Sequence, residues 1–185
     1  MAKQKYETIR EFIFYAYANL AMAHVAVEKK HEKYGMVHFM IRAKLYKGLK
    51  DGTINMKSIF DDEKIKLQIG QFCNYCGSNE NLALDHIFPK KNGGQDKADN
   101  LILACRACNS SKGKKDLMEW MNDSNVFFPI MIIRRYLKLL FVYCDENRLL
   151  DLTIEDFEKL QVPVNLSFIP LKYPRPTDLR LTIIE

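Results

Sequence analysis

The sequence has no internal repeat, no low-complexity tract and no apolar run long enough to cross a membrane. Its most apolar stretch, residues 12–27, contains Asn19 and His24 and falls short of the ~20 apolar residues that a spanning helix needs. The composition, with 48% hydrophobic and 28% charged residues, is ordinary for a folded chain and excludes a mostly disordered one. These absences leave roughly one globular domain, or a small module with helical additions.

The same apolar stretch has a rival interpretation as a secretory signal, because basic residues precede it at Lys3, Lys5 and Arg10. The acidic residues Glu7 and Glu11 interrupt that basic segment, however, which is not typical of a signal. We therefore expect a buried helix at residues 12–27.

The cysteines argue against a disulfide framework. There are five cysteines, an odd number that a disulfide framework would leave incomplete. Four of them stand in two Cys-x-x-Cys pairs, Cys73 with Cys76 and Cys105 with Cys108. Two such thiolate pairs can close a tetrahedral shell around Zn²⁺, which leaves no open position for chemistry, so we expect this zinc to be structural. Metal-type pairs suit a reducing compartment, and we expect a cytoplasmic protein.

Glycine and proline are absent from residues 8–34, where apolar residues recur at helical spacing. We expect one long helix there, ended by Gly35, and further helices at residues 36–49 and 58–69. Both sides of the first helix are apolar, which predicts burial all round or a subunit interface. Residues 1–70 are thus expected to form an N-terminal helical region.

Residues 71–116 show little helical periodicity and contain many turn-forming residues. Two segments, 82–87 and 100–104, alternate large apolar residues with smaller or polar ones and predict two strands joined by a long turn. A helix is expected to follow at residues 109–121. The sequence therefore predicts an α+β protein, a mainly helical chain around a small central module.

Residues 117–185 are expected to begin helical and end extended. The pattern predicts an apolar helix at residues 130–150 and another at 153–160. This apolar helix and the first one can meet in one core or pair two chains. Prolines then predict an irregular tail: Pro163, Pro170, Pro174 and Pro176.

Polar side chains stand between and just after the cysteine pairs. Asp85 and His86 are adjacent, and Asn109 directly follows the second pair. Carboxylate and amide oxygens can hold a hard divalent cation, and a neutral imidazole, with a pKa of about 6.5, can accept a proton from water. These side chains indicate a metal-dependent nuclease whose chemistry lies away from the zinc.

Taken together, the motifs resemble the HNH endonuclease family. The resemblance rests on Cys73-x-x-Cys76, Asp85-His86-x-x-Pro89, Gly93-Gly94, Asn100-Leu101, Cys105-x-x-Cys108-Asn109 and Lys112. It implies the ββα-metal fold, in which two strands, a helix and one zinc site form the module.

The family resemblance implies a role for each matching residue. His86 is expected to be the general base, and Asp85 and Asn109 to be ligands of a catalytic Mg²⁺ or Mn²⁺. An amide at the Asn109 position, where the family often has histidine, favours these hard ions over Zn²⁺ or Ni²⁺. Asn100 is expected to hydrogen-bond backbone across the long turn and so to fix His86. The products would carry 5′-phosphate and 3′-hydroxyl ends.

The charge balance permits nucleic-acid binding without establishing it. The chain has a net charge of +5, and residues 71–115 carry seven basic and four acidic side chains. We expect nucleic-acid contacts from the lysines of the module: Lys90, Lys91, Lys112, Lys114 and Lys115.

The expected substrate is DNA, cut by a restriction or phage-defence nuclease that acts as a homodimer or as a subunit of a defence complex. No membrane partner is expected. Two alternatives stay open: a nuclease of structured RNA, and a noncatalytic zinc module that binds nucleic acid or a partner protein.

Overall fold

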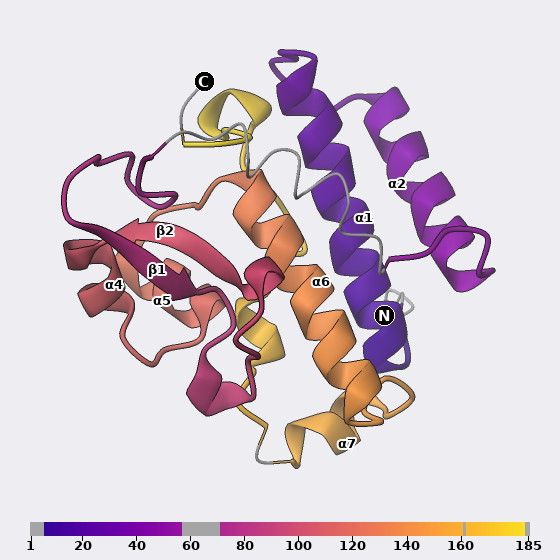
Figure 1. The fold of residues 1–185 in the computed structure, drawn as a ribbon. Coiled ribbons are helices and arrows are strands. Elements are labelled where there is room, and N and C mark those ends of the chain that lie inside the picture. The colour runs from indigo at the N-terminus through magenta and orange to yellow at the C-terminus, as the bar shows by residue number, and fades with distance from the viewer. Residues whose placement is uncertain (1–5, 57–70, 161, 184–185) are drawn as a thin grey trace.

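One small antiparallel sheet lies at one side of a largely helical chain in the computed structural model, which describes residues 6–56, 71–160 and 162–183 (Figure 1). This confirms the predicted α+β class; the helix expected at residues 58–69 lies outside the described residues. The elements in chain order are α1 (Ile9–Glu28), α2 (Met36–Lys50), β1 (Leu82–His86), β2 (Leu101–Cys105), α4 (Arg106–Lys112), α5 (Leu117–Ser124), α6 (Ile130–Glu146) and α7 (Ile154–Glu158).

Helix α1 begins as expected but ends early. Its N-terminus is capped by Thr8, whose hydroxyl accepts the Glu11 backbone N–H at 3.3 Å. It ends at Glu28 because Lys30 takes a left-handed conformation (φ 54°) and the His31 backbone N–H closes on the Ala26 carbonyl at 2.9 Å. The prediction of one helix up to residue 34 is therefore wrong. Local hydrogen bonding, and not a glycine, ends this helix.

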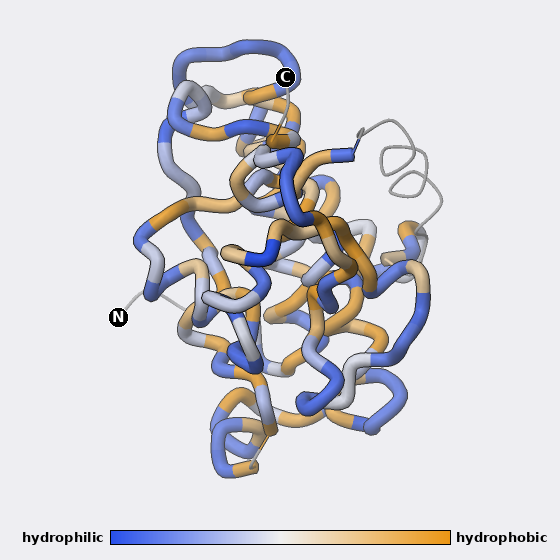
Figure 2. Tube along the Cα trace, turned by 60° about the vertical axis from the view of Figure 1, so that its left-hand side comes forward, coloured by the Kyte–Doolittle hydropathy of each residue, from blue (hydrophilic) through white to orange (hydrophobic). Residues whose placement is uncertain are grey.

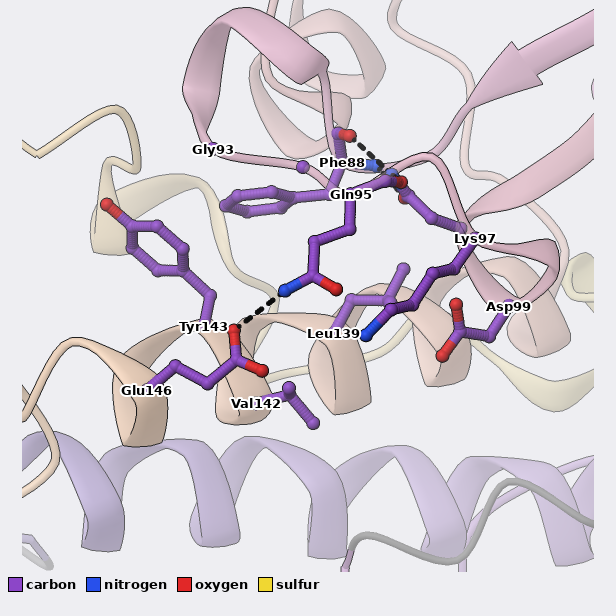
Figure 3. A pocket seen from close by; sticks show the side chains of 11 residues that line it. Phe88, Gly93, Gln95, Lys97, Asp99, Leu139, Val142, Tyr143 and Glu146 are labelled. Atoms are coloured by element: carbon purple, nitrogen blue, oxygen red, sulfur yellow. Dashed lines mark hydrogen bonds between the residues drawn. The ribbon is translucent and has the colours of Figure 1, made fainter.

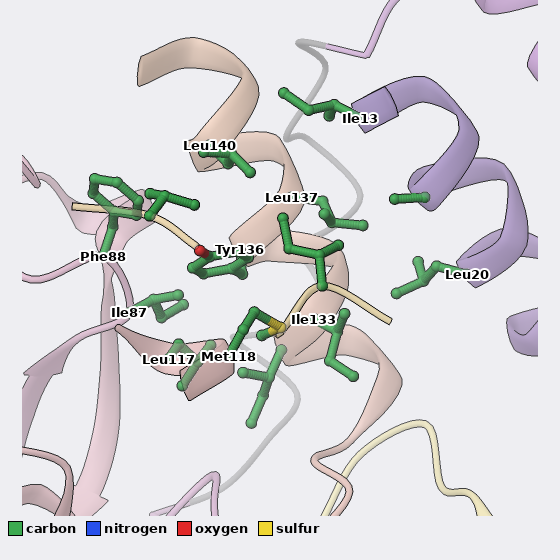
Figure 4. Close-up of a cluster of buried hydrophobic side chains, with 14 of the residues drawn as sticks. Ile13, Leu20, Ile87, Phe88, Leu117, Met118, Ile133, Tyr136, Leu137 and Leu140 are labelled. Carbon is green, nitrogen blue, oxygen red and sulfur yellow. The ribbon is translucent and has the colours of Figure 1, made fainter. Parts of the chain in front are cut away.

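The two apolar helices α1 and α6 lie side by side in one core (Figures 1 and 4). Ile13 and Leu20 of α1 face Ile133, Leu137 and Leu140 of α6, and all five are buried. Burying such a side chain contributes about 1.5–3 kcal/mol. The sequence left open whether these two helices meet in one core or pair two chains, and here they meet in the core of one chain. Helix α2 packs on the outer side of α1 (Figure 1).

The opposite side of α6 carries the central module. Ile87 and Phe88, which follow β1, pack with Leu117 and Met118 of α5 around Tyr136 (Figure 4). The buried cluster thus includes side chains from all three regions that the sequence predicts, and their standing as separate domains stays a prediction.

Two helices replace the single one expected at residues 109–121. Helix α4 ends at Lys112, and Gly113 follows with φ 54°. Asp116 then starts α5, because its Oδ1 accepts the Met118 backbone N–H at 2.9 Å. The buried Tyr136 hydroxyl donates to the other carboxylate oxygen at 2.7 Å. The long-helix prediction is wrong because a capping aspartate, held by a distant tyrosine, restarts the helix.

Hydrophobic segments run through the interior, and hydrophilic ones gather in the outer loops (Figure 2). Helix α6 ends at Glu146, and after α7 the described chain has only two short 3₁₀ turns, as the prolines predict. None of the helices in the described ranges is long and apolar enough to cross a membrane.

Candidate active site

The antiparallel strands β1 and β2 form a hairpin whose two ends define the two ends of the module. Leu82 pairs with Cys105 and His86 with Leu101, so the Cys105 end and the His86 end of the hairpin are opposite. Helix α4 starts directly after Cys105 and runs back along the hairpin until Lys112 reaches the His86 carbonyl (2.7 Å). The module therefore has a cysteine end and an Asp85–His86 end.

The four cysteines of the two pairs form one cluster, as their spacing predicts. The four Sγ atoms of Cys73, Cys76, Cys105 and Cys108 all lie within 4.8 Å of one another, and the Cys76 and Cys105 sulfurs are 3.7 Å apart. A tetrahedral Zn²⁺ with Zn–S bonds of about 2.3 Å would place its sulfurs about 3.8 Å apart. The cluster can therefore hold a zinc ion.

Backbone and burial act differently on these thiols. The Cys108 backbone N–H donates to the Cys105 sulfur at 3.5 Å and lowers the Cys105 pKa to about 7. Burial raises the pKa of the Cys76 and Cys108 thiols. Cys144 stands apart, buried in α6, where burial raises its pKa to about 12. The fifth cysteine is thus a packed thiol.

Asn100 holds together the long turn between the strands, residues 87–100. Its side-chain oxygen accepts the Phe88 N–H at 2.8 Å, and its amide nitrogen donates to the carbonyls of Phe88 (2.9 Å) and Gln95 (2.8 Å). The backbone adds a bond from Ile87 N–H to the Asn100 carbonyl at 2.9 Å. Asn100 does hydrogen-bond backbone across the turn, directly beyond His86.

Gly94 lets the turn close on itself. Its backbone N–H donates to the Pro89 carbonyl at 3.0 Å. A Cβ at this position would lie 1.9 Å from the Phe88 carbonyl oxygen, which no side chain tolerates without movement of the backbone. The second glycine of the Gly93-Gly94 pair is therefore required by close approach of the chain to itself.

Asp85 is buried, 5% exposed, with a donor on each carboxylate oxygen. Tyr75 donates its hydroxyl to Oδ2 at 2.8 Å, and the Lys112 ammonium lies 3.2 Å from Oδ1. Burial and the Asp85 charge hold the Tyr75 pKa well above its usual range, so the phenol stays a donor. An ionised carboxylate offers about four lone-pair sites, so two remain beside these contacts.

His86 ends β1 with its side chain 23% exposed. Its Nε2 lies 2.8 Å from Asp96 Oδ1, and Lys90 contacts the other oxygen of Asp96 at 2.7 Å. The hydrogen bond from Lys90, followed by that from His86, lowers the pKa of Asp96. The imidazole is therefore held at one nitrogen by an ionised carboxylate.

Asn109 lies on α4, three residues before Lys112 and so on the same face of the helix. Since Lys112 contacts Asp85 and the His86 carbonyl, this face of α4 is turned toward the Asp85–His86 end of the hairpin. In the described part of the chain the Asn109 side chain has no hydrogen-bond partner. Asp85 and His86 thus lie at the same end of the module, and Asn109 lies on the face of α4 that is turned toward that end.

The five lysines predicted to contact nucleic acid fall into three groups. Lys112 is only 1% exposed, which does not fit its predicted contact with nucleic acid. Lys90 pairs with Asp96, and Lys115 with Asp123. Lys91 and Lys114 are exposed, and no ion pair within the described ranges involves them. The sequence could not reveal the burial of Lys112, because its partner Asp85 is distant along the chain.

The turn also docks on α6 (Figure 3). Gln95 donates to the Glu146 carboxylate at 3.0 Å, and the Phe88 and Tyr143 rings are 5.2 Å apart. The small pocket between turn and helix is lined largely by these side chains. The C-terminal region thus supports the turn that follows His86.

Sequence reasoning missed two residues that touch the site, Tyr75 and Asp96. Tyr75 lies inside the first cysteine pair, a position next to predicted ligands that could have drawn attention to it. Asp96 is one of two acidic residues in the turn, and no local signal marks it. Both act through contacts ten residues away in sequence.

Comparisons with known proteins agree with this geometry. The HNH endonuclease family model matches residues 73–115. The CRISPR-associated endonuclease Cas9 of Corynebacterium diphtheriae is 34% identical over 58 residues, which cover 29% of this chain and 5% of that protein. The chain thus spans a small part of that relative's length. No solved structure matches it. The matched segment contains the hairpin, the cysteine cluster, the long turn and α4, so the part of this chain that is similar to the HNH endonuclease family is the part that carries the candidate site.

Proposed function

We propose that this chain is a metal-dependent endonuclease that hydrolyses phosphodiester bonds in DNA. The observation that carries the proposal is the convergence of Asp85, His86 and the Asn109 face of α4 at one end of a hairpin in a segment matched by the HNH family. Zinc in the cysteine cluster would fix the opposite end and take no part in the chemistry.

His86 is the proposed general base, and its contacts select the nitrogen. Asp96 is ionised and can only accept, so His86 Nε2 carries the hydrogen of their 2.8 Å bond. The neutral ring then has its lone pair on Nδ1. We infer that Nδ1 takes the proton from the water that attacks phosphorus, a role worth about 10²–10⁴-fold in rate.

Asp85 and Asn109 are the proposed holders of a catalytic Mg²⁺ or Mn²⁺. The donor set fits a hard cation, because a carboxylate with two lone pairs left and an amide without a partner in the described residues both offer oxygen. When bound, the cation supplies positive charge to the dianionic transition state. Asp85 and Asn109 are the residues that would hold it.

Substrate binding is expected to use the exposed lysines that have no ion pair in the described residues, Lys91 and Lys114. Lys91 lies in the turn after β1, and Lys114 lies in the segment after α4. Contacts of this kind are independent of base sequence and weaken as salt rises. The products are expected to carry 5′-phosphate and 3′-hydroxyl ends. A defence role, a homodimer and a larger complex stay predictions.

Zinc-loaded protein incubated with supercoiled plasmid, single-stranded DNA and structured RNA, each in Mg²⁺, Mn²⁺ or EDTA, tests the proposal. Nicking of plasmid that EDTA abolishes is the expected result. Cleavage confined to RNA would show that the substrate is RNA and not DNA. Binding of nucleic acid without any cleavage would favour the noncatalytic zinc module.

A further inference from the structure

Tyr75 connects the cysteine cluster to the Asp85 carboxylate. It stands between Cys73 and Cys76, and its side chain is 5% exposed. Its hydroxyl donates to Asp85 Oδ2 at 2.8 Å. The backbone of Tyr75 thus belongs to the cysteine end of the module, and its hydroxyl reaches the Asp85–His86 end.

The Tyr75 ring is held on several sides. Its centroid lies 4.9 Å from that of Trp120 in an edge-on contact and 5.3 Å from that of Phe128. The neighbouring Asn74 ties this segment to β2, since its backbone N–H donates to the Leu103 carbonyl at 2.9 Å and its amide does so at 3.0 Å. The hydroxyl therefore has a fixed position relative to β1.

Asp85 receives its two donors from different elements. Tyr75 approaches Oδ2 from the cysteine segment, and Lys112 approaches Oδ1 from the end of α4. Donors on both oxygens fix the plane of the carboxylate. Its remaining lone pairs then point in a set direction, which is what a metal ligand with narrow geometric tolerance requires.

We propose that Tyr75 is a positioning residue that fixes the Asp85 carboxylate for the catalytic divalent cation and couples the affinity of that site to the folded cysteine cluster. This inference rests on the proposed function of Asp85 as a ligand. Partners that orient a metal ligand typically change metal affinity or activity by about 10–100-fold when they are removed.

The chain supplies a matched control. Tyr136 is also buried, and its hydroxyl donates to the buried Asp116 at 2.7 Å, but this pair joins α6 to the start of α5. The variants Tyr75→Phe and Tyr136→Phe each delete one hydroxyl from a buried tyrosine–aspartate pair. Only the first deletion touches Asp85.

The test measures zinc content per chain, thermal unfolding, and Mn²⁺ binding followed by the electron paramagnetic resonance of free Mn²⁺. We expect Tyr75→Phe to keep its zinc and to lose about 10–100-fold in Mn²⁺ affinity, with the Mg²⁺ concentration for half-maximal plasmid nicking rising in step. Tyr136→Phe should bind Mn²⁺ like the wild type. Unchanged Mn²⁺ affinity in Tyr75→Phe, or equal losses in both variants, would overturn the inference.

A double-mutant cycle with Asp85→Asn separates positioning from folding. If Tyr75 acts through Asp85, Tyr75→Phe has no further effect on Mn²⁺ affinity once Asp85 is replaced. A further loss in the double variant would show an effect through the fold and contradict the proposal. If the wild-type protein neither binds Mn²⁺ nor cuts DNA, both the proposed function and this inference are wrong. If Tyr75→Phe cuts normally at low Mg²⁺, only the inference is wrong.

Discussion

The molecule buries a tyrosine–aspartate pair in each of two regions, and the two differ in what else the carboxylate touches. In the module, Tyr75 donates to Asp85, whose other oxygen meets the Lys112 ammonium. Between α5 and α6, Tyr136 donates to Asp116, whose other oxygen accepts a backbone N–H and caps a helix. Neutral donors surround Asp116, whereas Asp85 faces a cation.

This difference separates a structural carboxylate from a candidate functional one. Asp116 satisfies a helix end that would otherwise expose N–H groups, and burial raises its pKa. Asp85 caps nothing, lies next to His86, and shares its partner Lys112 with the His86 carbonyl. The same kind of hydrogen bond thus supports a helix start in one region and, in the proposal above, orients the Asp85 carboxylate in the other.

The largest expected effect comes from disrupting the cysteine cluster next to the Tyr75–Asp85 pair. Cys105→Ser should lose zinc and nuclease activity together, because structural zinc sites supply about 10–16 kcal/mol of apparent binding free energy to folding. Tyr75 then loses its fixed position, while α1 and α6 keep their helical signal. Zinc content, circular dichroism and Trp120 fluorescence measure this. The control Cys144→Ser, a buried thiol outside the cluster, should keep its zinc.

Exchanging each aspartate for asparagine tests the comparison directly. Asp85→Asn should lower the rate of plasmid nicking by about 100-fold or more, since loss of a ligand exceeds the effect of losing its partners. Asp116→Asn should nick at the wild-type rate. Equal rates for the two variants, measured at saturating Mg²⁺, would remove the distinction between the pairs.

The turn beyond His86 depends on a single glycine. Gly94→Ala should destabilise the protein by about 1–3 kcal/mol, because the added Cβ meets the Phe88 carbonyl and the backbone must shift. Urea unfolding measures the cost. The control is Gly35→Ala, where a Cβ would lie 4.0 Å from its nearest neighbour, His38 Nδ1. Similar stability of the two variants would argue against the close approach.

The smallest effect is a pH dependence from Asp116. Burial raises the pKa of Asp116 in the folded protein above its usual value. The wild type therefore gains stability relative to Asp116→Asn as pH falls through the folded pKa, and loses that gain as pH rises again. Urea unfolding of both proteins between pH 7 and pH 4 should show the difference moving in favour of the wild type. A constant difference would mean that burial does not shift this carboxyl.

The sequence predicted correctly those features that depend on residues close together in the chain. The Cys-x-x-Cys spacing marked the cluster, alternation marked both strands, and the Asn100 motif marked a residue that does bridge the turn. Each of these signals lies within a few residues of its structural consequence.

The rest depends on partners distant in the chain. The break after Lys112 is stabilised by Asp116 and its bond to Tyr136, and the burial of Lys112 follows from its pairing with Asp85. Tyr75 and Asp96 gain their places only when the module closes. Periodicity carries no record of such side-chain pairs, because they are set by packing.

The central claim, that the Asp85–His86 end of the module cleaves DNA, is tested most directly by the rate of plasmid nicking in Mg²⁺ for wild type, His86→Ala and the control His31→Ala, all zinc-loaded. We predict metal-dependent nicking by wild type and by His31→Ala, and a rate lower by about 10²–10⁴-fold for His86→Ala. Nicking by His86→Ala at the wild-type rate would contradict the account.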